Sequence, residues 1–435
     1  MRIMTSYKVK IRHYSNIFRD TIEQYRRAVR FFLEVCDAEW QELSDLIGKG
    51  RNNRLERLTI RTAKNPAPKY DFSQEFYKFP CYLRRAAIQE ALGLYSAYRE
   101  KLEAWEKDPA GRKPSLCWAG RMMPAMYRDN MYVRTGEYTA KVKVFIRNTW
   151  DWLEVGLRKS DVDYISRHCA GRRECVPTLQ KSGKQWFLIF SFKEEQTLHT
   201  KPAKMQRVLS VDVGLNNACT VTAMETDGTV TGMAFLSLPA EEDSLSHAVN
   251  RIKKAQQHGA HQTPRLWAAV KGINRHISEE TADFIMEKAV EFQADTIVFE
   301  HLDAGGRKHG SKRQRIHLWR SQAVQAIVTG KAHRLGLRVS RVNAWGTSRL
   351  AFDGSGAVER GIGGNYSMCR FTSGKIYHCD LNAAYNIGAR YFIRERIKYL
   401  PETARLQLEA KVPQVCKRST CTLSTLLKLD AALAA

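Results

Sequence analysis

Residues 208–217 read VLSVDVGLNN, an apolar strand that is interrupted by Asp212 and followed by Gly214. An acid inside an apolar strand is costly unless it is paired or binds a cation, so Asp212 is the strongest candidate for a functional carboxylate. Gly214 allows a backbone or a phosphate group to approach the strand closely. This stretch therefore predicts a buried strand that ends in a chemically active acid.

Two more acids stand at comparable places further along the chain. Glu300 ends the strand-like stretch ADTIVFE, and Asp380 opens the helix-like stretch CDLNAAYNIGAR. Taken alone, Glu300 is equally consistent with a surface residue at a strand end, and Asp380 with a helix cap. Taken together, acids in one strand, at the end of a second strand and at the start of a helix are the parts of an RNase H-like nuclease site. In such sites carboxylates bind two Mg²⁺ ions about 4 Å apart.

The hydrophobic pattern around these acids predicts the rest of the fold. Apolar or period-two runs predict five strands, at 208–211, 218–224, 229–235, 296–299 and 337–342. Helical periodicity predicts three helices, at about 268–292, 317–336 and 383–399. Upstream, alternation at 7–11 and between 132 and 192 predicts a small β-barrel with a hairpin turn at 181–184. Helical stripes separate the first strand of this barrel from the others. We therefore expect an α+β multidomain fold, with an RNase H-like α/β nuclease domain, a β-barrel and a helical domain.

The composition indicates a polyanionic partner. The 435 residues include 70 Lys and Arg against 45 Asp and Glu, a formal net charge of +25. Phosphate backbones explain such a charge better than a membrane surface does, because the basic residues are spread along the chain. With 43% hydrophobic residues the chain is not a disordered basic tail. It has no apolar run of spanning length and no signal-peptide pattern at its start, so we expect a cytoplasmic protein.

Three stretches resemble the split RuvC motifs of a known family. They are VLSVDVGLNNACTVTA, DTIVFEHLD and CDLNAAYNIGAR. The family is that of the TnpB transposon-encoded RNA-guided nucleases and the compact type V CRISPR effectors, the miniature type V-F effectors especially. GKQWFLIFSFK is similar to the last strand of the family's wedge barrel, and residues 317–349 look like the helix and strand that lead to its zinc ribbon. The resemblance implies that Asp212, Glu300 and Asp380 are the catalytic acids and bind Mg²⁺, for which we expect Mn²⁺ to substitute.

The resemblance also implies the partners and the domain organisation. We expect a guide RNA, a double-stranded DNA target and a role in antiviral defence, and we favour a homodimer on one guide RNA over a monomer. The expected domains are the first wedge strand (1–14), a helical recognition domain (15–128), the wedge β-barrel (129–203), RuvC motifs I and II (204–343), a target-strand loading insertion (344–379), RuvC motif III (380–400) and a C-terminal helical tail (401–435).

One departure from the family is plain. Thr347-Ser348-Arg349 occupies the place of a family tripeptide, but no CxxC pair follows it. The later half of this insertion offers only Cys369, His378 and Cys379. Tetrahedral zinc needs four ligands, so we expect no bound zinc.

Packing must then hold the insertion in place of a metal. We expect four aromatic residues to provide it: Trp345, Phe352, Tyr366 and Phe371. Arg349, which belongs to the retained tripeptide, is the candidate for contacting the scissile phosphate.

Two basic surfaces are predicted to bind nucleic acid. Between residues 304 and 342 there are ten Lys or Arg residues and no acid. Five of them follow Glu300 in a glycine-containing stretch: Arg307, Lys308, Lys312, Arg313 and Arg315. A charge run without counter-charge beside carboxylates favours nucleic acid over a solvated loop. The second surface, with interleaved aromatic residues that are equally consistent with core positions, comprises Arg26, Arg27, Arg30, Arg84 and Arg85.

The sequence thus predicts an RNA-guided DNA endonuclease that hydrolyses phosphodiester bonds at one RuvC site. With one site, we expect the displaced strand to be cut first and the target strand second. One alternative is a guide-independent RNase H-like enzyme, such as a resolvase or transposase, which has no need of the N-terminal 200 residues. The other is a guided DNA-binding protein with weak or no cleavage.

Overall fold

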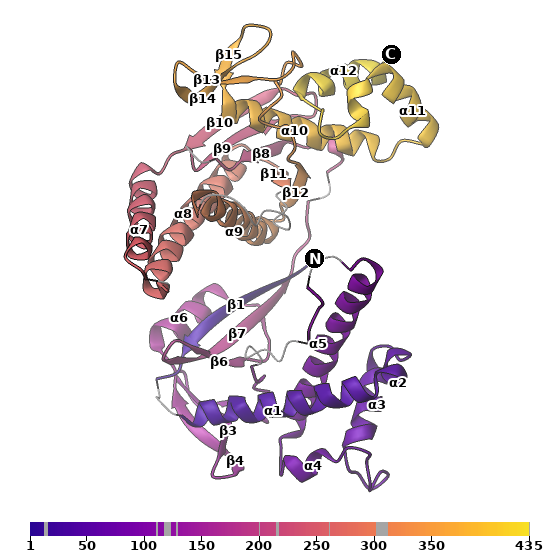
Figure 1. Ribbon diagram of the computed structural model, residues 1–435, viewed down its shortest axis with the longest axis vertical. Helices are drawn as coiled ribbons and strands as arrows, with labels where there is room; N and C mark the ends of the chain where they lie inside the picture. Colours follow the sequence, from indigo (N-terminus) through magenta and orange to yellow (C-terminus); the bar gives the residue numbers. More distant parts are fainter. Residues whose placement is uncertain are drawn as a thin grey trace. The chain divides into compact units, whose positions relative to one another are not determined.

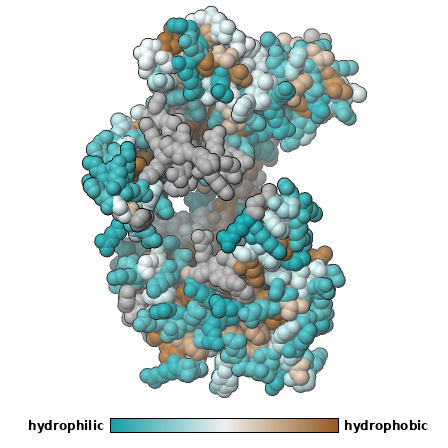
Figure 2. Space-filling view, in the orientation of Figure 1, coloured by the Kyte–Doolittle hydropathy of each residue, from teal (hydrophilic) through white to brown (hydrophobic). Residues whose placement is uncertain are grey.

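The computed structural model describes residues 1–12, 16–109, 112–116, 123–127, 129–199, 201–214, 217–260, 262–301 and 312–434, and of residues 312–319 only the backbone. The chain forms two compact units, Arg2–Glu194 and Glu195–Ala435, the latter including Met1 (Figure 1). We call them the N-terminal unit and the C-terminal unit. The face shown in Figure 2 is largely hydrophilic, with small separate apolar areas. No helix within the described ranges is long and apolar enough to cross a membrane.

The N-terminal unit combines helices with two small sheets. Its helices are α1 (Ile17–Ala38), α2 (Trp40–Ser44), α3 (Lys49–Thr59), α4 (Phe72–Glu75), α5 (Cys81–Lys107) and α6 (Lys159–His168). Its strands are β1 (Arg2–Lys10), β2 (Tyr132–Arg134), β3 (Thr139–Ile146), β4 (Thr149–Gly156), β5 (Arg173–Glu174), β6 (Thr178–Ser182) and β7 (Gln185–Glu195). One sheet has the order β1-β7-β5 with β6 also paired to β7, and the other is β2-β3-β4. The first strand of the chain therefore pairs with a strand beyond the helices, as predicted.

Two tight hairpins fix the register of these sheets. Strands β3 and β4 are joined by Arg147 and Asn148, both at positive φ (47° and 64°), as a two-residue hairpin turn requires. Strands β6 and β7 are joined by Gly183, at φ 59°, and Lys184. The predicted turn at 181–184 is confirmed.

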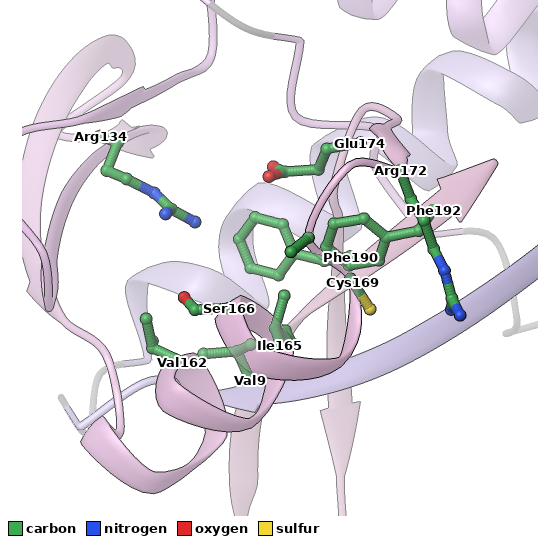
Figure 3. Close-up of a pocket in the computed structure, with 11 residues that line it drawn as sticks. Val9, Arg134, Val162, Ile165, Ser166, Cys169, Arg172, Glu174, Phe190 and Phe192 are labelled. Carbon is green, nitrogen blue, oxygen red and sulfur yellow. The ribbon is translucent and has the colours of Figure 1, made fainter. Parts of the chain in front are cut away.

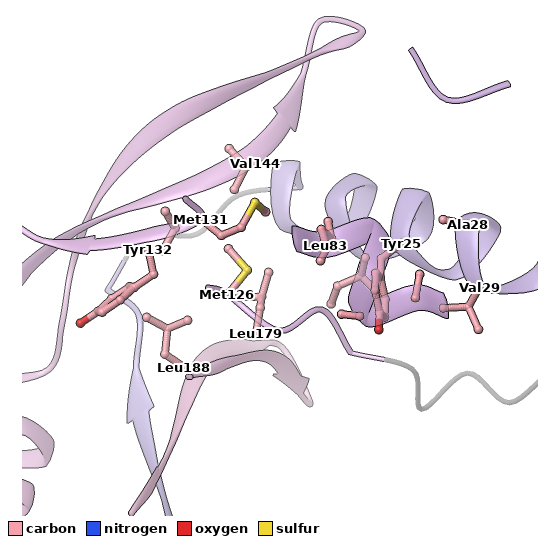
Figure 4. Packing of buried hydrophobic residues seen from close by; sticks show 14 of the residues in the cluster. Tyr25, Ala28, Val29, Leu83, Met126, Met131, Tyr132, Val144, Leu179 and Leu188 are labelled. Atoms are coloured by element: carbon pink, nitrogen blue, oxygen red, sulfur yellow. The ribbon is translucent and has the colours of Figure 1, made fainter. Parts of the chain in front are cut away.

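Helices and strands of the N-terminal unit share one hydrophobic core. Tyr25 and Val29 of α1 belong to the same buried cluster as Leu83 of α5 and Leu188 of β7 (Figure 4). Helix α1 places its buried residues at three- and four-residue steps, which is why one stripe of it faces the sheet. The helical segment is thus built into the β-rich part of this unit.

The C-terminal unit is built on a five-stranded sheet. Its strands are β8 (Val208–Asp212), β9 (Cys219–Met224), β10 (Val230–Leu236), β11 (Thr296–His301) and β12 (Arg338–Asn343), in the order β10-β9-β8-β11-β12. Strand β9 is antiparallel to both of its neighbours, whereas β11 is parallel to β8 and to β12. All five predicted strands are confirmed.

Helices cover both faces of this sheet. They are α7 (Pro239–Gln257), α8 (Pro264–Glu291), α9 (Lys312–Arg334), α10 (Cys379–Ile397), α11 (Glu402–Lys411) and α12 (Leu423–Ala434), with 3-10 turns at Ala203–Met205 and Pro413–Cys416. A small sheet of β13 (Glu359–Ile362), β14 (Asn365–Arg370) and β15 (Ile376–His378) precedes α10. The three predicted helices are confirmed as α8, α9 and α10, while the hydrophobic pattern did not predict α7 or the small sheet.

Alternate residues of the central strands face different helices. Val211 and Phe299 pack in the cluster that includes Val324 of α9, whereas Val208 and Val298 pack with Phe392 of α10. Side chains alternate between faces along a strand, so the residues after Val211 and Phe299 point to the α10 face. These residues are Asp212 and Glu300.

Candidate active site

Asp212 and Glu300 lie side by side on the sheet. Asp212 is the last residue of β8, and Glu300 is the penultimate residue of β11. The two strands are parallel, and their register pairs Val211 with Phe299, immediately before the two acids. Paired positions on neighbouring strands are about 5 Å apart, so both carboxylates occupy one edge and one face of the sheet. Both residues are half-buried.

Asp380 reaches the same place from the helix. It lies in the first turn of α10, where the positive end of the helix dipole favours a carboxylate. The helix cap is His378, whose Nδ1 accepts a hydrogen bond from the Asp380 backbone N–H at 3.2 Å, so Asp380 itself does not cap the helix. The Asn217 Nδ2 donates to Oδ2 of Asp380 at 3.0 Å. Asp380 is therefore held in position with its carboxylate available for other contacts.

The electrostatics of the site show that the acids influence one another. Burial raises the pKa of Asp212 well above its usual range, and the charges of Glu300 and Asp380 raise it further, while Arg360 lowers it. Burial also raises the pKa of Glu300, against the hydrogen bond from Thr347 and the charge of Arg390. Like charges held together in this way repel each other and resist ionisation. Within the described ranges no three Cys, His, Asp or Glu side chains converge closely enough to hold a metal ion.

A close approach at Gly214 supports this arrangement. A Cβ atom added to Gly214 would stand 2.8 Å from the Asn217 carbonyl oxygen and 3.7 Å from Oδ2 of Asp380. The first distance is shorter than a carbon and a backbone oxygen tolerate. The prediction of a close approach at this glycine is confirmed, and the approaching group is the backbone that carries Asn217.

Thr347 and Arg390 hold the end of the sheet that carries Glu300. The Thr347 hydroxyl donates a hydrogen bond to Oε1 of Glu300. The buried Arg390 guanidinium donates to four backbone carbonyls at 2.7–2.9 Å, those of Asn343, Trp345, Ser419 and Cys421. Neither residue was predicted as part of the site, although Thr347 belongs to the retained tripeptide that drew attention to Arg349.

Arg360 is a further residue that the sequence did not single out. It lies on β13, and its Nη2 donates to the Ser348 carbonyl at 2.9 Å. Its charge favours the ionised form of Asp212. Arg349 itself is exposed, and among the described residues its guanidinium has no ion-pair partner.

Aromatic packing holds the segment between β12 and α10, but only half of the predicted residues take part. Phe371 is buried, and its ring centroid lies 5.3 Å from that of Phe352, which also packs on Tyr377 at 5.1 Å. Trp345 and Tyr366 are 69% and 73% exposed, so the prediction was wrong for these two residues. Trp345 begins a turn, and Tyr366 lies at the start of β14 just after a turn, where their rings stay exposed.

The cysteines of this segment are buried beside the same aromatic cluster. Cys369 and Cys379 belong to the cluster of Phe371. Burial raises the pKa of Cys369 to about 12, and it also raises the pKa of Cys379. Both sulfurs are therefore protonated thiols at neutral pH in the absence of a metal ion.

The predicted basic surfaces are described in part. Arg307 and Lys308 lie outside the described residues. Lys312, Arg313 and Arg315 lie in the first turn of α9, where the side chains are not described. The role of this basic stretch stays a prediction.

The second basic surface is partly neutralised by acids of its own unit. Arg27 pairs with Glu75 at 2.9 Å, and Arg85 pairs with Glu56 at 3.4 Å. Arg26 and Arg84 are half-buried, Arg30 is exposed, and burial lowers the pKa of Arg84. Of the interleaved aromatic residues, Phe79 is core while Tyr77 and Tyr82 are exposed.

A separate small pocket of about 190 Å³ lies in the N-terminal unit (Figure 3). Val9 of β1, Phe190 of β7 and Ile165 of α6 form its apolar wall, and Arg134 and Glu174 are also part of its lining. None of the predicted site residues lines this pocket.

Comparisons with known proteins give the following similarities. The model of the Aq_aa04 family matches residues 5–146, which is less than half of the chain. No curated protein matches the chain. The chain is similar to the Cas12f1–sgRNA–target DNA complex, at 13% identity and a TM-score of 0.33 over 88% of this chain and 98% of that chain. It is also similar to the mini-RNA-guided endonuclease CRISPR-Cas_phi3, at 9% identity and a TM-score of 0.48 over 89% and 92% of the two chains.

A third similar structure is CasPhi-2 (Cas12j) bound to crRNA and phosphorothioate DNA, at 11% identity and a TM-score of 0.43 over 90% of this chain and 91% of that chain. At such identities and TM-scores the likeness places no residue of the site, so the roles of the acids rest on their own geometry.

Proposed function

We propose that this chain is an RNA-guided DNA endonuclease that cuts its target through a single RuvC-type site. The observation that carries the proposal is that Asp212, Glu300 and Asp380 come from β8, β11 and the first turn of α10, and that the charges of the other two acids act on Asp212. The pKa of Asp212 is raised by burial and then by both other acids. Three carboxylates in these elements and this order support an RNase H-like nuclease site.

The donor set of this site suits Mg²⁺ in charge and chemistry. Carboxylate oxygens are the ligands that this hard cation prefers, and the repulsion that raises the pKa of Asp212 is what a divalent cation compensates. When bound, two Mg²⁺ ions, or Mn²⁺ in their place, would supply activation of the attacking water and stabilisation of the leaving oxygen. Asp212 and Glu300 would hold one or both ions, and Asp380 would complete the ligand set.

The surrounding residues then have separate tasks. The Thr347 hydroxyl orients Glu300, and the Asn217 amide orients Asp380. Arg360, anchored on the Ser348 carbonyl, places a positive charge beside Asp212, where it would stabilise the charge of the scissile phosphate. Arg349 is exposed and free to contact the substrate strand beside them.

The guide RNA would supply the sequence recognition. The net charge of +25 suits a complex with both RNA and DNA. We assign residues 1–14 and 129–203 to a wedge barrel and residues 15–128 to a recognition domain, which together would hold the guide–target heteroduplex. Residues 344–379 would be a degenerate loading insertion without zinc. One site per chain implies that the displaced strand is cut before the target strand, and a homodimer on one guide RNA is part of the proposal.

The RNA that co-purifies with the protein is the first test. The protein would be expressed from its own genomic neighbourhood, and the bound RNA would be sequenced. A single structured RNA with one variable end supports the proposal, and that end identifies a CRISPR array or a transposon flank as its source. Heterogeneous RNA, or none, would favour a guide-independent nuclease that acts on branched DNA.

Cleavage by the loaded complex is the second test. With Mg²⁺ and matched target DNA, the wild type should cut, while Asp212→Ala should bind the target and leave it uncut. Asp243→Ala, an exposed acid of α7, is the matched control and should cut normally. If the wild type binds its target with the guide RNA but does not cut it in the presence of Mg²⁺, the chain is a guided DNA-binding protein and not a nuclease.

A further inference from the structure

A basic cavity lies beside the site, between the edge strand β12 and the C-terminal half of α10. Its volume is about 790 Å³, and residues of α11 and of the segment 415–421 close it. Six of the residues that line it are arginine or lysine: Arg341, Arg390, Arg394, Lys398, Arg405 and Arg418. The single acid in the lining is Glu395. So large an excess of positive charge around one cavity suits a polyanion.

The cavity begins next to the strand position that carries Glu300. His301, which follows Glu300 in β11, is part of the lining. So are Val342 and Asn343, which pair with Glu300 and His301 in the register of β11 and β12. The lining therefore includes the residue that follows Glu300 in β11 and the residue that pairs with Glu300 in β12.

Some of the basic residues that line the cavity already have partners within the protein. The Arg390 guanidinium donates hydrogen bonds to four backbone carbonyls. Arg394 forms an ion pair with Glu395 at 2.8 Å. Arg405 pairs with Glu409 at 3.3 Å. Arg390 and Arg394 are thus parts of the wall.

Arg341 and Arg418 have their charges available, and the Lys398 ammonium is hydrogen-bonded to Tyr399 and interacts with the charge of Glu395. In the described parts of the chain none of the three forms an ion pair with a carboxylate, and Arg341 and Arg418 are exposed. The Arg341 Nε donates to the Gln325 side chain at 2.8 Å, which fixes its position. The Lys398 ammonium lies 4.9 Å from the ring centroid of Tyr399.

Two exposed aromatic residues lie next to lining residues along the chain. Trp345, 69% exposed, lies two residues after Asn343, and its backbone carbonyl accepts a hydrogen bond from Arg390. Tyr399, 77% exposed, lies between the lining residues Lys398 and Leu400. Basic groups combined with exposed aromatic rings are the means by which proteins bind single strands, through phosphate contacts and base stacking.

We propose that this cavity binds the phosphate backbone of single-stranded DNA and leads that strand to Glu300. The role of the strand at Glu300 rests on the proposed nuclease function. Binding of DNA by the cavity can be measured without cleavage. Arg341, Lys398 and Arg418 contact the phosphates, and Trp345 and Tyr399 stack on bases.

The test uses the full-length protein with Asp212→Ala, so that bound DNA stays intact. Binding of a fluorescent single-stranded oligonucleotide is measured by anisotropy at several salt concentrations, before and after adding Lys398→Ala and Arg418→Ala together. We expect a roughly tenfold weaker Kd and a salt slope shallower by about 1.4, since each lost phosphate contact removes about 0.7 from the slope for single strands. The matched control is Lys253→Ala with Lys254→Ala on α7, which removes the same charge from an exposed helix and should leave both values unchanged.

A second variant addresses stacking. Trp345→Ala keeps the backbone carbonyl that Arg390 binds, and it should weaken single-strand binding roughly fivefold or more with no change in the salt slope. Unchanged affinity in both cavity variants would overturn the proposal, and so would a loss of guide-RNA binding equal to the loss of DNA binding. If the wild type never cuts but the cavity variants still lose single-strand binding, the cavity is supported and the nuclease function fails.

Discussion

The Thr347 hydroxyl donates a hydrogen bond to Oε1 of the Glu300 carboxylate. The bond joins the loop after β12 to the penultimate residue of β11, and Thr347 is itself buried. Because the bond orients one oxygen of the carboxylate, it also fixes which oxygen remains free for a metal ion. Thr347 is therefore a positioning residue for the proposed reaction.

Thr347→Val should keep the fold and lose the orientation of Glu300. We expect cleavage to fall roughly 10- to 100-fold, as for loss of a hydrogen bond to a charged group, and the Mg²⁺ concentration for half-maximal activity to rise. Thr347→Ser, which keeps the hydroxyl, should restore most of both. A Thr347→Val enzyme with lower activity but an unchanged Mg²⁺ requirement would show that the residue acts on the fold alone.

Asp212→Asn should make the metal-free protein more stable. The pKa of Asp212 is raised by burial and by two neighbouring carboxylates, so its ionised form destabilises the folded state at neutral pH. The neutral amide should add on the order of 1 kcal/mol to the free energy of unfolding. Asp227→Asn is the opposite case, because backbone hydrogen bonding from Thr229 lowers the pKa of Asp227, and this change should reduce stability.

Thermal unfolding with and without Mg²⁺ tests whether a bound cation relieves the repulsion between Asp212 and the other two acids. Mg²⁺ should raise the Tm of the wild type and leave that of Asp212→Asn nearly unchanged. A lower stability of Asp212→Asn without metal would mean that the carboxylate is a structural partner and not a ligand.

Gly214→Ala should damage the site without unfolding the unit. The added Cβ would press on the Asn217 carbonyl, and Asn217 holds Asp380 through its side chain. We expect cleavage to fall at least tenfold, in line with the loss of geometry at a metal site. Gly272→Ala is the matched control, since a Cβ there meets nothing within 4 Å and lies in α8, where alanine should add up to about 1 kcal/mol of stability. Equal activity of the two variants would contradict the role given to Gly214.

Arg390→Met should destabilise the C-terminal unit strongly. The substitution leaves four buried or half-buried backbone carbonyls without their donor, at an expected cost of about 3 kcal/mol or more. Urea unfolding of the full chain measures this cost. Arg275→Met, which breaks an exposed ion pair with Glu279 on α8, should change stability by less than about 1 kcal/mol. A similar effect of the two substitutions would show that the Arg390 hydrogen bonds are not limiting.

The sequence singled out residues whose own position in the chain is unusual, and it did not single out residues whose roles depend on distant partners. Asp212 and Glu300 stand out because an acid beside an apolar strand is unusual in the chain itself, and the strand periods place both of them correctly. Thr347, Asn217 and Arg360 look ordinary in the sequence, because their roles depend on partners that are distant along the chain.

Packing at turns was the other source of error. Trp345 and Tyr366 were predicted to be core residues because they are aromatic, yet both are exposed. Composition indicates that an aromatic ring prefers burial, but whether a neighbouring element covers it depends on topology. Phe352 and Phe371 do meet, and Tyr385 of α10 packs on Phe352 beside them.

The contacts of Arg390 also decide when the site can form during synthesis. Asp380 lies in α10, and Arg390 of the same helix is anchored on the carbonyls of Ser419 and Cys421. The same helix packs in one cluster with Leu426 and Leu429 of α12. All three acids leave the ribosome before these residues do, so the nascent chain carries its carboxylates for some time without the support that holds them together. The proposed cleavage site is thus completed late in synthesis, after the parts proposed to hold the guide have had time to fold.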